Sequence, residues 1–299
     1  MSQTATKMSV DHLSGTEYDE YLQLAREVAR QAGVRIKHTF DQERSPADEK
    51  SIEFKGLIDL VTQTDKEVEE YIISTIKNRY PDHEFLAEES YKGGAYNFTN
   101  KPTWIIDPID GTTNFVHKYP FVCVSIGFSI NKRVVVGVVF NPVLNEFYDA
   151  VRGHGAFLNG KKIHVSGFQS LHKCVVATNV GYDRSEEGAD FMLGNIRRLL
   201  MANVQSMRSE GTSAVDLSGV ALGRLDCFYE YGVHPWDIAA GSLLVEEAGG
   251  IVVDPLFPMD HPQNTPSLNL ENRRVLGGNK HVVALVLELL QQAKVPEKW

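Results

Sequence analysis

Residues 104–115 read Trp-Ile-Ile-Asp-Pro-Ile-Asp-Gly-Thr-Thr-Asn-Phe, and this stretch decides how the chain is interpreted. Three apolar residues predict a strand that ends at Asp107, and Pro108 then turns the chain. Asp110 follows, so that two carboxylates flank one point in space. Gly111 lets the backbone approach a ligand closely, and a short helix that starts there would direct its amide N–H groups to the same point. The stretch therefore predicts a phosphate site beside a pair of carboxylates.

The ligand chemistry of this site indicates a hard cation. Carboxylate and phosphate oxygens are the ligands that Mg²⁺ prefers, whereas Zn²⁺ sites use nitrogen and sulfur. The chain has a formal net charge of -9 and no basic run, so neither a nucleic-acid nor a membrane partner is expected. An anionic substrate would meet an acidic protein here, and bound divalent cations would resolve that conflict.

Further acids stand at the ends of predicted elements. Glu88 and Glu89 close an apolar strand fragment, where adjacent carboxylates repel unless one is neutralised. Asp65 and Asp237 each open a predicted helix, where an acid can simply complement the helix dipole. Each acid by itself could be structural. Together they lie where open α/β sheets collect their ligand sites, and this coincidence favours a metal cluster. A structural calcium site is a further alternative, but it would need no Thr112 near the metal and would give stability without turnover.

Helical and strand patterns alternate along the rest of the chain, which predicts a layered α/β fold. One helix is expected over residues 16–39 with Thr16 as its N-cap, and another from Thr64, where Thr64 and Glu67 would form a capping box. Short apolar runs between residues 84 and 152 predict strands. The later elements are expected as strands near 174–178 and 225–231 and as helices near 188–202, 212–222 and 235–248 and from Asn279.

The 299 residues are 42% hydrophobic, enough for a substantial core. Residues 1–15 are polar, lack the apolar segment of a signal peptide and are expected to be a disordered tail. Residues 16–299 are expected to form one domain with two α/β subdomains, roughly 16–165 and 166–299. The chain has no run of 18 apolar residues, and its cysteines suggest buried thiols rather than a disulfide framework, which predicts a cytoplasmic protein.

Two segments, Asp107 to Thr113 and Trp236 to Gly250, resemble the signature motifs of the inositol monophosphatase family. The resemblance covers about residues 18–290 and keeps the order of the family's elements. It implies a five-layer α-β-α-β-α sandwich, a homodimer, dependence on Mg²⁺ and inhibition by Li⁺. The remaining matching segments are Thr62 to Asp65, Glu88-Glu89, Gly211-Thr212-Ser213 and Glu230.

The resemblance also implies metal ligands. Glu88, Asp107 and the backbone carbonyl of Ile109 would hold a first Mg²⁺ ion. A second ion would be held by Asp107, Asp110 and Asp237. Glu88 would also help with a weaker third ion, so that each site would take two to three ions. Because a phosphate monoester dianion repels a nucleophile, cations that neutralise its oxygens are what the reaction needs.

Catalytic and substrate-binding roles are implied for other matching residues. Asp65 and Thr112 would orient and deprotonate the attacking water, Glu88 would take part in catalysis, and Glu89 would support the metal ligands from behind. No Cys-x5-Arg motif indicates a covalent route. The substrate contacts implied are Asp110, Gly111, Thr112, Thr113, Gly211, Thr212, Ser213, Glu230 and Asp237.

The leading hypothesis for function is hydrolysis of inositol monophosphate to inositol and phosphate by metal-activated water. Alternatives are a phosphatase for another small sugar phosphate, such as galactose 1-phosphate, and a non-catalytic regulatory protein on the same fold. Thr113 favours the inositol group, because related nucleotidases and histidinol phosphatases tend to carry Lys or Arg there. A pure binding protein could lose Asp65 or Thr112, and both are present. The family's pattern changes at Lys55 and in the loop of residues 255–272.

Overall fold

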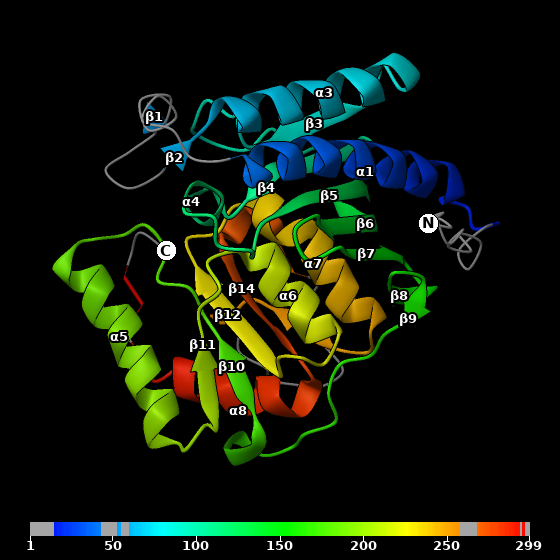
Figure 1. The fold of residues 1–299 in the computed structure, drawn as a ribbon. Helices are drawn as coiled ribbons and strands as arrows, with labels where there is room; N and C mark the ends of the chain where they lie inside the picture. Colours follow the sequence, from blue (N-terminus) through cyan, green and yellow to red (C-terminus); the bar gives the residue numbers. More distant parts are fainter. Residues whose placement is uncertain (1–14, 43–52, 55–59, 257–267, 294, 297–299) are drawn as a thin grey trace, which may run out of the picture.

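The computed structural model describes residues 15–42, 53–54, 60–256, 268–293 and 295–296. The chain folds into five layers, α-β-α-β-α, with two sheets separated by a pair of helices (Figure 1). The five-layer fold implied by the resemblance is confirmed. The helices of the three α layers are α1 (Asp19–Asp41) with α3 (Gln63–Arg79), α6 (Ser213–Ala221) with α7 (Pro235–Glu247), and α5 (Glu186–Met201) with α8 (Lys280–Leu290).

The first sheet has seven strands in the order β3-β4-β5-β6-β7-β8-β9. Only β3 and β4 run parallel, and every other neighbouring pair is antiparallel. Helices cover both faces, so the central strands are nearly continuous apolar runs, as the sequence predicts. The strands are β3 (Glu84–Ala87), β4 (Thr103–Asp110), β5 (Cys123–Ile130), β6 (Arg133–Asn141), β7 (Glu146–Val151), β8 (Gly155–Leu158) and β9 (Lys161–Lys162).

The second sheet has five strands in the order β11-β10-β12-β14-β13. β10 runs parallel to both of its neighbours, and β14 runs antiparallel to both of its own. The sequence predicted β10 and β12 but missed the other three strands. The strands are β10 (Val175–Ala177), β11 (Ser206–Arg208), β12 (Cys227–Tyr231), β13 (Ile251–Val253) and β14 (Arg274–Gly278).

Short elements complete the described chain. β1 and β2 pair antiparallel apart from the two main sheets, and α4 follows β4 directly. The short elements are β1 (Glu53–Phe54), β2 (Leu60–Val61), α4 (Thr112–Val116) and the 3-10 helices η2 (Leu171–Lys173) and η3 (Leu270–Asn272).

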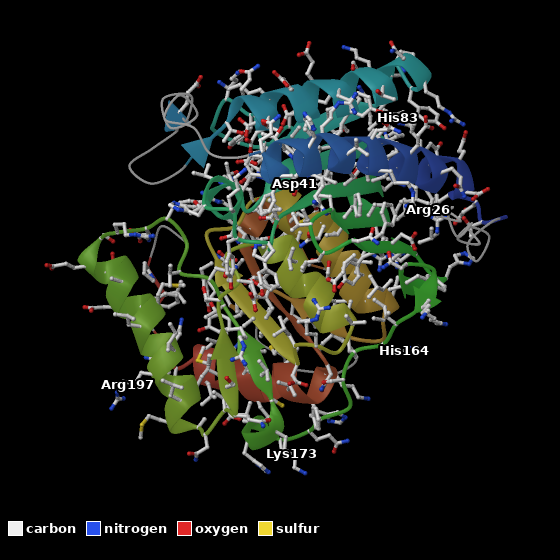
Figure 2. The ribbon with its side chains drawn as sticks, in the orientation of Figure 1. Arg26, Asp41, His83, His164, Lys173 and Arg197 are labelled. Atoms are coloured by element: carbon white, nitrogen blue, oxygen red, sulfur yellow. The ribbon has the colours of Figure 1, made fainter. Side chains whose placement is uncertain are left out.

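Each α layer has its own apolar contacts. α1 buries the stripe predicted from the sequence, with Leu22, Ala29 and Ile36 fully covered against the first sheet. α5 and α8 cover the second sheet with residues such as Phe191. The outer face of α5 carries charged residues, and Figure 2 shows Arg197 projecting from it, although Leu193, Leu200 and Met201 are exposed on this helix too. The two outer layers are therefore amphipathic, whereas the helices of the middle layer are buried almost all round.

Glycines set how closely the middle layer packs. A Cβ at Gly137 of β6 would lie 2.9 Å from the carbonyl oxygen of Ala240, so α7 lies almost directly on the sheet. A Cβ at Gly241 of α7 would lie 2.7 Å from the Cβ of Leu217 on α6. The close packing keeps α6 and α7 together on one face of the sheet and fixes where their N-termini lie.

Three local predictions were wrong. α1 begins at Asp19 after Tyr18, and Thr16 is not its N-cap. The capping box of α3 consists of Thr62 and Asp65 rather than Thr64 and Glu67, because the carboxylate of Asp65 accepts the backbone N–H of Thr62 at 3.0 Å.

The third wrong prediction concerns Pro108. It does not end the strand, because β4 continues to Asp110 through an irregular step in its pairing with β5. An irregular step tolerates proline, which has no N–H to give to a ladder.

Some predictions concern residues that the structure does not describe, and others concern the chain in general. Residues 1–14 of the predicted tail, Lys55 and residues 257–267 of the predicted loop lie outside them. Cys123, Cys174 and Cys227 are free thiols, and all three residues are buried. None of the helices in the described part of the chain is long and apolar enough to cross a bilayer.

The contact between α6 and α7 leads to a stability prediction. Gly241→Ala should lower the free energy of unfolding by about 1–3 kcal/mol, because the new methyl group has no room beside Leu217. Gly194→Ala is the matched control, since a Cβ there meets only the flexible end of Arg198, and it should be neutral or stabilising by up to about 1 kcal/mol. Urea unfolding of both variants measures the difference, and equal effects would contradict the packing argument.

Candidate active site

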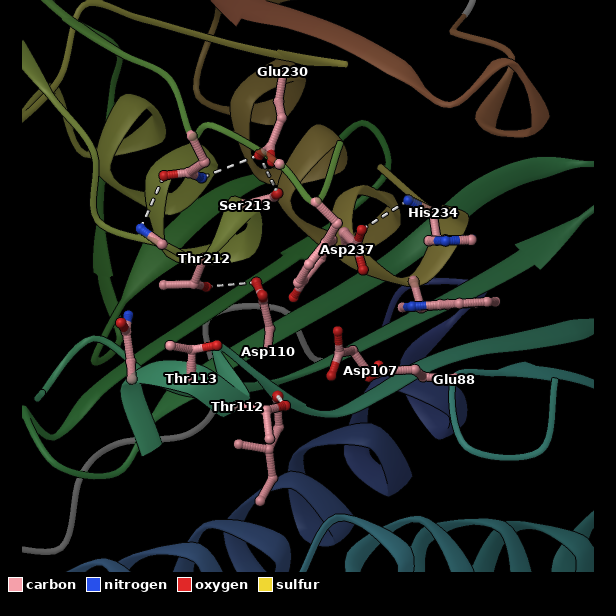
Figure 3. A pocket seen from close by; sticks show the side chains of 18 of the residues that line it. Glu88, Asp107, Asp110, Thr112, Thr113, Thr212, Ser213, Glu230, His234 and Asp237 are labelled. Atoms are coloured by element: carbon pink, nitrogen blue, oxygen red, sulfur yellow. Dashed lines mark hydrogen bonds between the residues drawn. The ribbon is translucent and has the colours of Figure 1, made fainter. Parts of the chain in front are cut away.

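A pocket of about 440 Å³ opens where β4, β12, α4 and the N-termini of α6 and α7 meet (Figure 3). Every sequence-predicted site residue lines it except Asp65 and Glu89. The pocket therefore gathers residues that are spread over 150 positions of the chain, roughly half its length. The predicted residues in its lining are Glu88, Asp107, Ile109, Asp110, Gly111, Thr112, Thr113, Gly211, Thr212, Ser213, Glu230 and Asp237.

The irregular step in β4 places both of its carboxylates in the pocket. Asp107 pairs with Ser125 of β5, but Asp110 pairs with Cys123, so three steps on β4 match two on β5. In a regular strand, residues three apart point to opposite faces of the sheet. One extra residue restores the match, and Figure 3 shows both carboxylates on the same side.

Gly111 then turns the chain out of the sheet. Its φ of +91° is in the left-handed region, and a Cβ there would lie 2.9 Å from the carbonyl oxygen of Phe121. Both facts favour glycine. α4 starts at the next residue, as the sequence predicted, so that Thr112 and Thr113 border the pocket directly after Asp110.

Asp110 links the first sheet to the middle helices. Its Oδ2 accepts a hydrogen bond from Thr212 Oγ1 at 2.5 Å (Figure 3) and another from the backbone N–H of Ala214 at 2.7 Å. Ala214 lies in the first turn of α6, where the helix dipole favours a negative charge. Burial nevertheless raises the pKa of Asp110 to about 6.

Asp237 lies in the first turn of α7 and faces the other acids. Its Oδ2 accepts the backbone N–H of His234 at 2.7 Å. Burial raises the pKa of Asp237 well above its ordinary value, and the charges of Asp110 and Glu88 raise it further. Acids that repel one another in this way would be stabilised by a cation between them.

Glu230, the next-to-last residue of β12, lies at the opposite wall of the pocket. Its Oε2 accepts hydrogen bonds from Ser213 Oγ at 2.7 Å and from Asn179 Nδ2 at 3.1 Å. Burial raises the pKa of Glu230 to about 7, and the charge of Asp110 adds to the shift. This wall combines a hydrogen-bond acceptor with small polar groups, which suits the hydroxyl groups of a ligand.

Thr112 connects the pocket to Asp65. Its Oγ1 lies 3.1 Å from Asp65 Oδ1 and 3.1 Å from the carbonyl oxygen of Ile109. Asp65 comes from α3 in the outer layer, is fully buried and does not line the pocket. Burial raises the pKa of Asp65 to about 6, although its bonds with Thr62 oppose the shift. A proton can therefore pass from the pocket to Asp65 through the hydroxyl of Thr112.

Glu69 organises the turn that carries the two adjacent acids. Its Oε2 accepts the backbone N–H of Glu89 at 2.7 Å, and its Oε1 accepts the hydroxyl of Ser90. Glu88 lines the pocket, while Glu89 does not. Sequence reasoning missed Glu69, because an acid in the middle of an amphipathic helix carries no local signal of such a role.

Other residues of the lining were also missed. Asn114 Nδ2 donates to the carbonyl oxygens of Phe121 at 2.8 Å and Glu210 at 2.6 Å, which ties α4 to the loop before α6. His234 also lines the pocket, with its ring stacked on Trp236, and a single histidine without ligand spacing gives no signal of such a place in the sequence. Asn179 comes two residues after the end of β10, and a polar residue after a strand is the signal that had identified the acids.

The donor set fits a hard divalent cation. Glu88, Asp107, Asp110 and Asp237 offer carboxylate oxygens and Ile109 offers a carbonyl oxygen, all in one pocket. Within the residues that the structure describes, no three His, Cys, Asp or Glu side chains already form a complete metal cluster. The carboxylates would therefore have to draw together around a cation, as expected for groups of like charge.

Comparisons with known proteins agree with this geometry. The family model described as "Inositol monophosphatase family" matches residues 17–294. The inositol monophosphatase of Dictyostelium discoideum is 51% identical over 272 residues, covering 91% of this chain and 95% of the relative.

Two solved structures are also similar. The extragenic suppressor protein suhB from Bartonella henselae has a TM-score of 0.79 and 32% identity, with 92% of this chain and 100% of that one covered. The Thermotoga maritima IMPase has a TM-score of 0.77 and 32% identity, with 91% and 97% covered. With the fold, the pocket and the sequence in agreement, this chain belongs to the inositol monophosphatase family.

Proposed function

We propose that this protein is a magnesium-dependent phosphoric monoester hydrolase that converts inositol monophosphate to inositol and phosphate. The observation that carries the proposal is the pocket itself. It gathers four carboxylates, Glu88, Asp107, Asp110 and Asp237, and it also contains Glu230 and Ser213, which suit the hydroxyl groups of a polyol. Thr112 lines the pocket too and connects it to the buried Asp65 behind. The family and its named relatives are phosphatases, and the inositol monophosphatase of Dictyostelium discoideum supports the choice of substrate.

The chain's own residues supply the base. When Thr112 Oγ1 donates its single proton to Asp65, its lone pairs are available to a water in the pocket. As that water loses a proton to Thr112, the proton of Thr112 passes to Asp65. A pKa near 6 suits this role, because such a carboxylate is ionised near neutral pH yet accepts a proton readily.

The family is metal-dependent, and we assign the ligands as the resemblance implies. Glu88, Asp107 and the Ile109 carbonyl would hold one ion, and Asp107, Asp110 and Asp237 another, with Glu88 helping a third. Bound Mg²⁺ supplies positive charge that neutralises the phosphate oxygens and eases deprotonation of water. Li⁺ is the expected inhibitor. Glu89, held behind the pocket by Glu69, supports Glu88.

The substrate would lie between the two walls. Residues 111–113 would contact the phosphate group, and residues 211–213 with Asp110 and Asp237 would contact the ester and the ring. Glu230 would accept a ring hydroxyl. We also propose that the protein is a cytoplasmic homodimer whose chain divides into subdomains near residue 165. The residue ranges of the two sheets, which lie on either side of that position, support the division.

Phosphate release from a substrate panel tests the proposed function. We expect inositol 1-phosphate to be hydrolysed faster than galactose 1-phosphate, histidinol phosphate or fructose 1,6-bisphosphate. EDTA should abolish the activity, added Mg²⁺ should restore it and Li⁺ should depress it. Faster turnover of galactose 1-phosphate would make that ester, rather than inositol 1-phosphate, the preferred substrate. No turnover of any ester would favour a regulatory protein on the same fold.

Replacing Asp65 should separate activity from stability. Its pKa is about 6 in the fold against an ordinary 3.8, so its contribution to stability is present below about pH 4 and lost as the pH rises through 6. Because Asp65 is the proposed base, Asp65→Asn should lose at least about 100-fold in kcat. At pH 7.5 the buried carboxylate of Asp65 is ionised at a cost in stability, so the Tm of the variant in EDTA should not fall below that of the wild type. Any gain in Tm should disappear near pH 4. Asp190→Asn, on the exposed face of α5, is the matched control.

The hydroxyl of Thr112 should matter more than its methyl group. Thr112→Ala removes the link between the pocket and Asp65 and should lower kcat by about 10²–10⁴-fold. Thr112→Ser keeps the hydroxyl and should keep most of the rate. Steady-state phosphate release at saturating Mg²⁺ compares the two, and equal rates for the alanine and serine variants would contradict the proton path.

A further inference from the structure

Asn179 uses both ends of its side-chain amide at the edge of the pocket. Its Nδ2 donates to Glu230 Oε2 at 3.1 Å and to Asp216 Oδ2 at 3.0 Å. Its Oδ1 accepts the backbone N–H of Gly211 at 2.9 Å and the hydroxyl of Ser209 at 3.3 Å. An asparagine amide has two donor hydrogens and two acceptor lone pairs, so this side chain is saturated.

The partners of Asn179 fix the direction of its amide. Gly211 can only donate its N–H, so the oxygen of Asn179 must face the loop before α6, and its nitrogen must face the carboxylates. One buried side chain therefore holds the end of β12 against the start of α6.

The hydrogen bonds on Glu230 leave one of its oxygens for a ligand. Both Asn179 and Ser213 donate to Oε2. Among the residues that the structure describes, none donates to Oε1, and Glu230 lines the pocket. The orientation of this carboxylate, and so the place of Oε1, depends on the two donors that hold Oε2.

Asp216 supports Asn179 from the side away from the pocket. It is fully buried in α6, does not line the pocket, and its Oδ2 accepts from Asn179. Its Oδ1 has no hydrogen-bond partner in the described part of the chain. Burial raises the pKa of Asp216 well above its ordinary value. A side chain without donors at residue 179 would leave two buried carboxyl groups facing each other.

We propose that Asn179 is a positioning residue that sets the carboxylate of Glu230 to accept a hydroxyl of the substrate's polyol, with Asp216 fixing Asn179 from behind. The inference rests on the proposed function and adds a determinant of specificity to it. Asn179 has no hydrogen bond to Asp107, Asp110 or Asp237 in the described structure, so it acts on the polyol rather than on the phosphate chemistry.

The first test compares a ligand that has a ring with one that has none. For Asn179→Ala we expect the KM for inositol 1-phosphate to rise about tenfold with little change in kcat. The inhibition constant for inorganic phosphate, which lacks the ring, should stay within about twofold of wild type. Asn195→Ala, at a buried asparagine of α5 outside the pocket, is the matched control and should change neither constant.

The second test asks whether Asn179 acts through Glu230. In a Glu230→Gln background, Asn179→Ala should add little to the rise in KM, because the group that it positions has already been altered. The inference would be overturned if Asn179→Ala raised KM by a further tenfold in the Glu230→Gln background. It would also be overturned if Asn179→Ala left KM unchanged, or weakened the binding of inorganic phosphate as much as that of inositol 1-phosphate.

A second variant tests the inference in case Asn179→Ala does not fold. If Asn179→Ala does not give a cooperative thermal transition, Asn179→Asp keeps the shape but lacks the amide donors, and it should show the same selective rise in KM. A normal KM in a folded Asn179→Asp variant would overturn the inference. Wild-type protein without activity on inositol 1-phosphate would instead refute the proposed function.

Discussion

The bond between Asp110 and the first turn of α6 is the interaction on which the rest of the site depends. One carboxylate oxygen accepts from Thr212 and from Ala214, and so attaches the end of β4 to the start of the middle helical layer. The second sheet lies on the other side of that layer. The position of Glu230 relative to the acids of β4 is therefore set by contacts that run through α6.

The site concentrates negative charge where water is scarce. Asp65, Asp110 and Glu230 all have pKa values raised by burial. The fold compensates with local donors, which come from a capping threonine, a helix N-terminus and an asparagine amide. These donors hold single carboxylates but do not cancel the repulsion among them. A chain arranged in this way would gain stability from a cation that binds among these carboxylates.

The acids could be predicted from the sequence because each stands next to a visible local signal. Asp107 follows an apolar strand and Asp237 follows a helix-starting proline, and the resemblance then supplied their roles. The position of Asn179 after a predicted strand was visible in the sequence, but its role was not, since its partners Gly211 and Glu230 lie 32 and 51 residues away. Strands β11 and β13 were missed for a similar reason. Three residues show no periodicity, and their pairing depends on neighbours brought in by the fold.

The extra residue in β4 limits how the sequence of this strand can evolve. Side chains alternate between the two faces of a strand. The irregular pairing step between Asp107 and Asp110 therefore decides which face of the sheet Asp110 points to. If the same residues paired regularly with β5, Asp110 would turn toward the layer of α1 and α3, away from its partners on α6. Substitutions along β4 can be absorbed one at a time, but loss of the irregular step without loss of a residue would divide the site between two faces of the sheet.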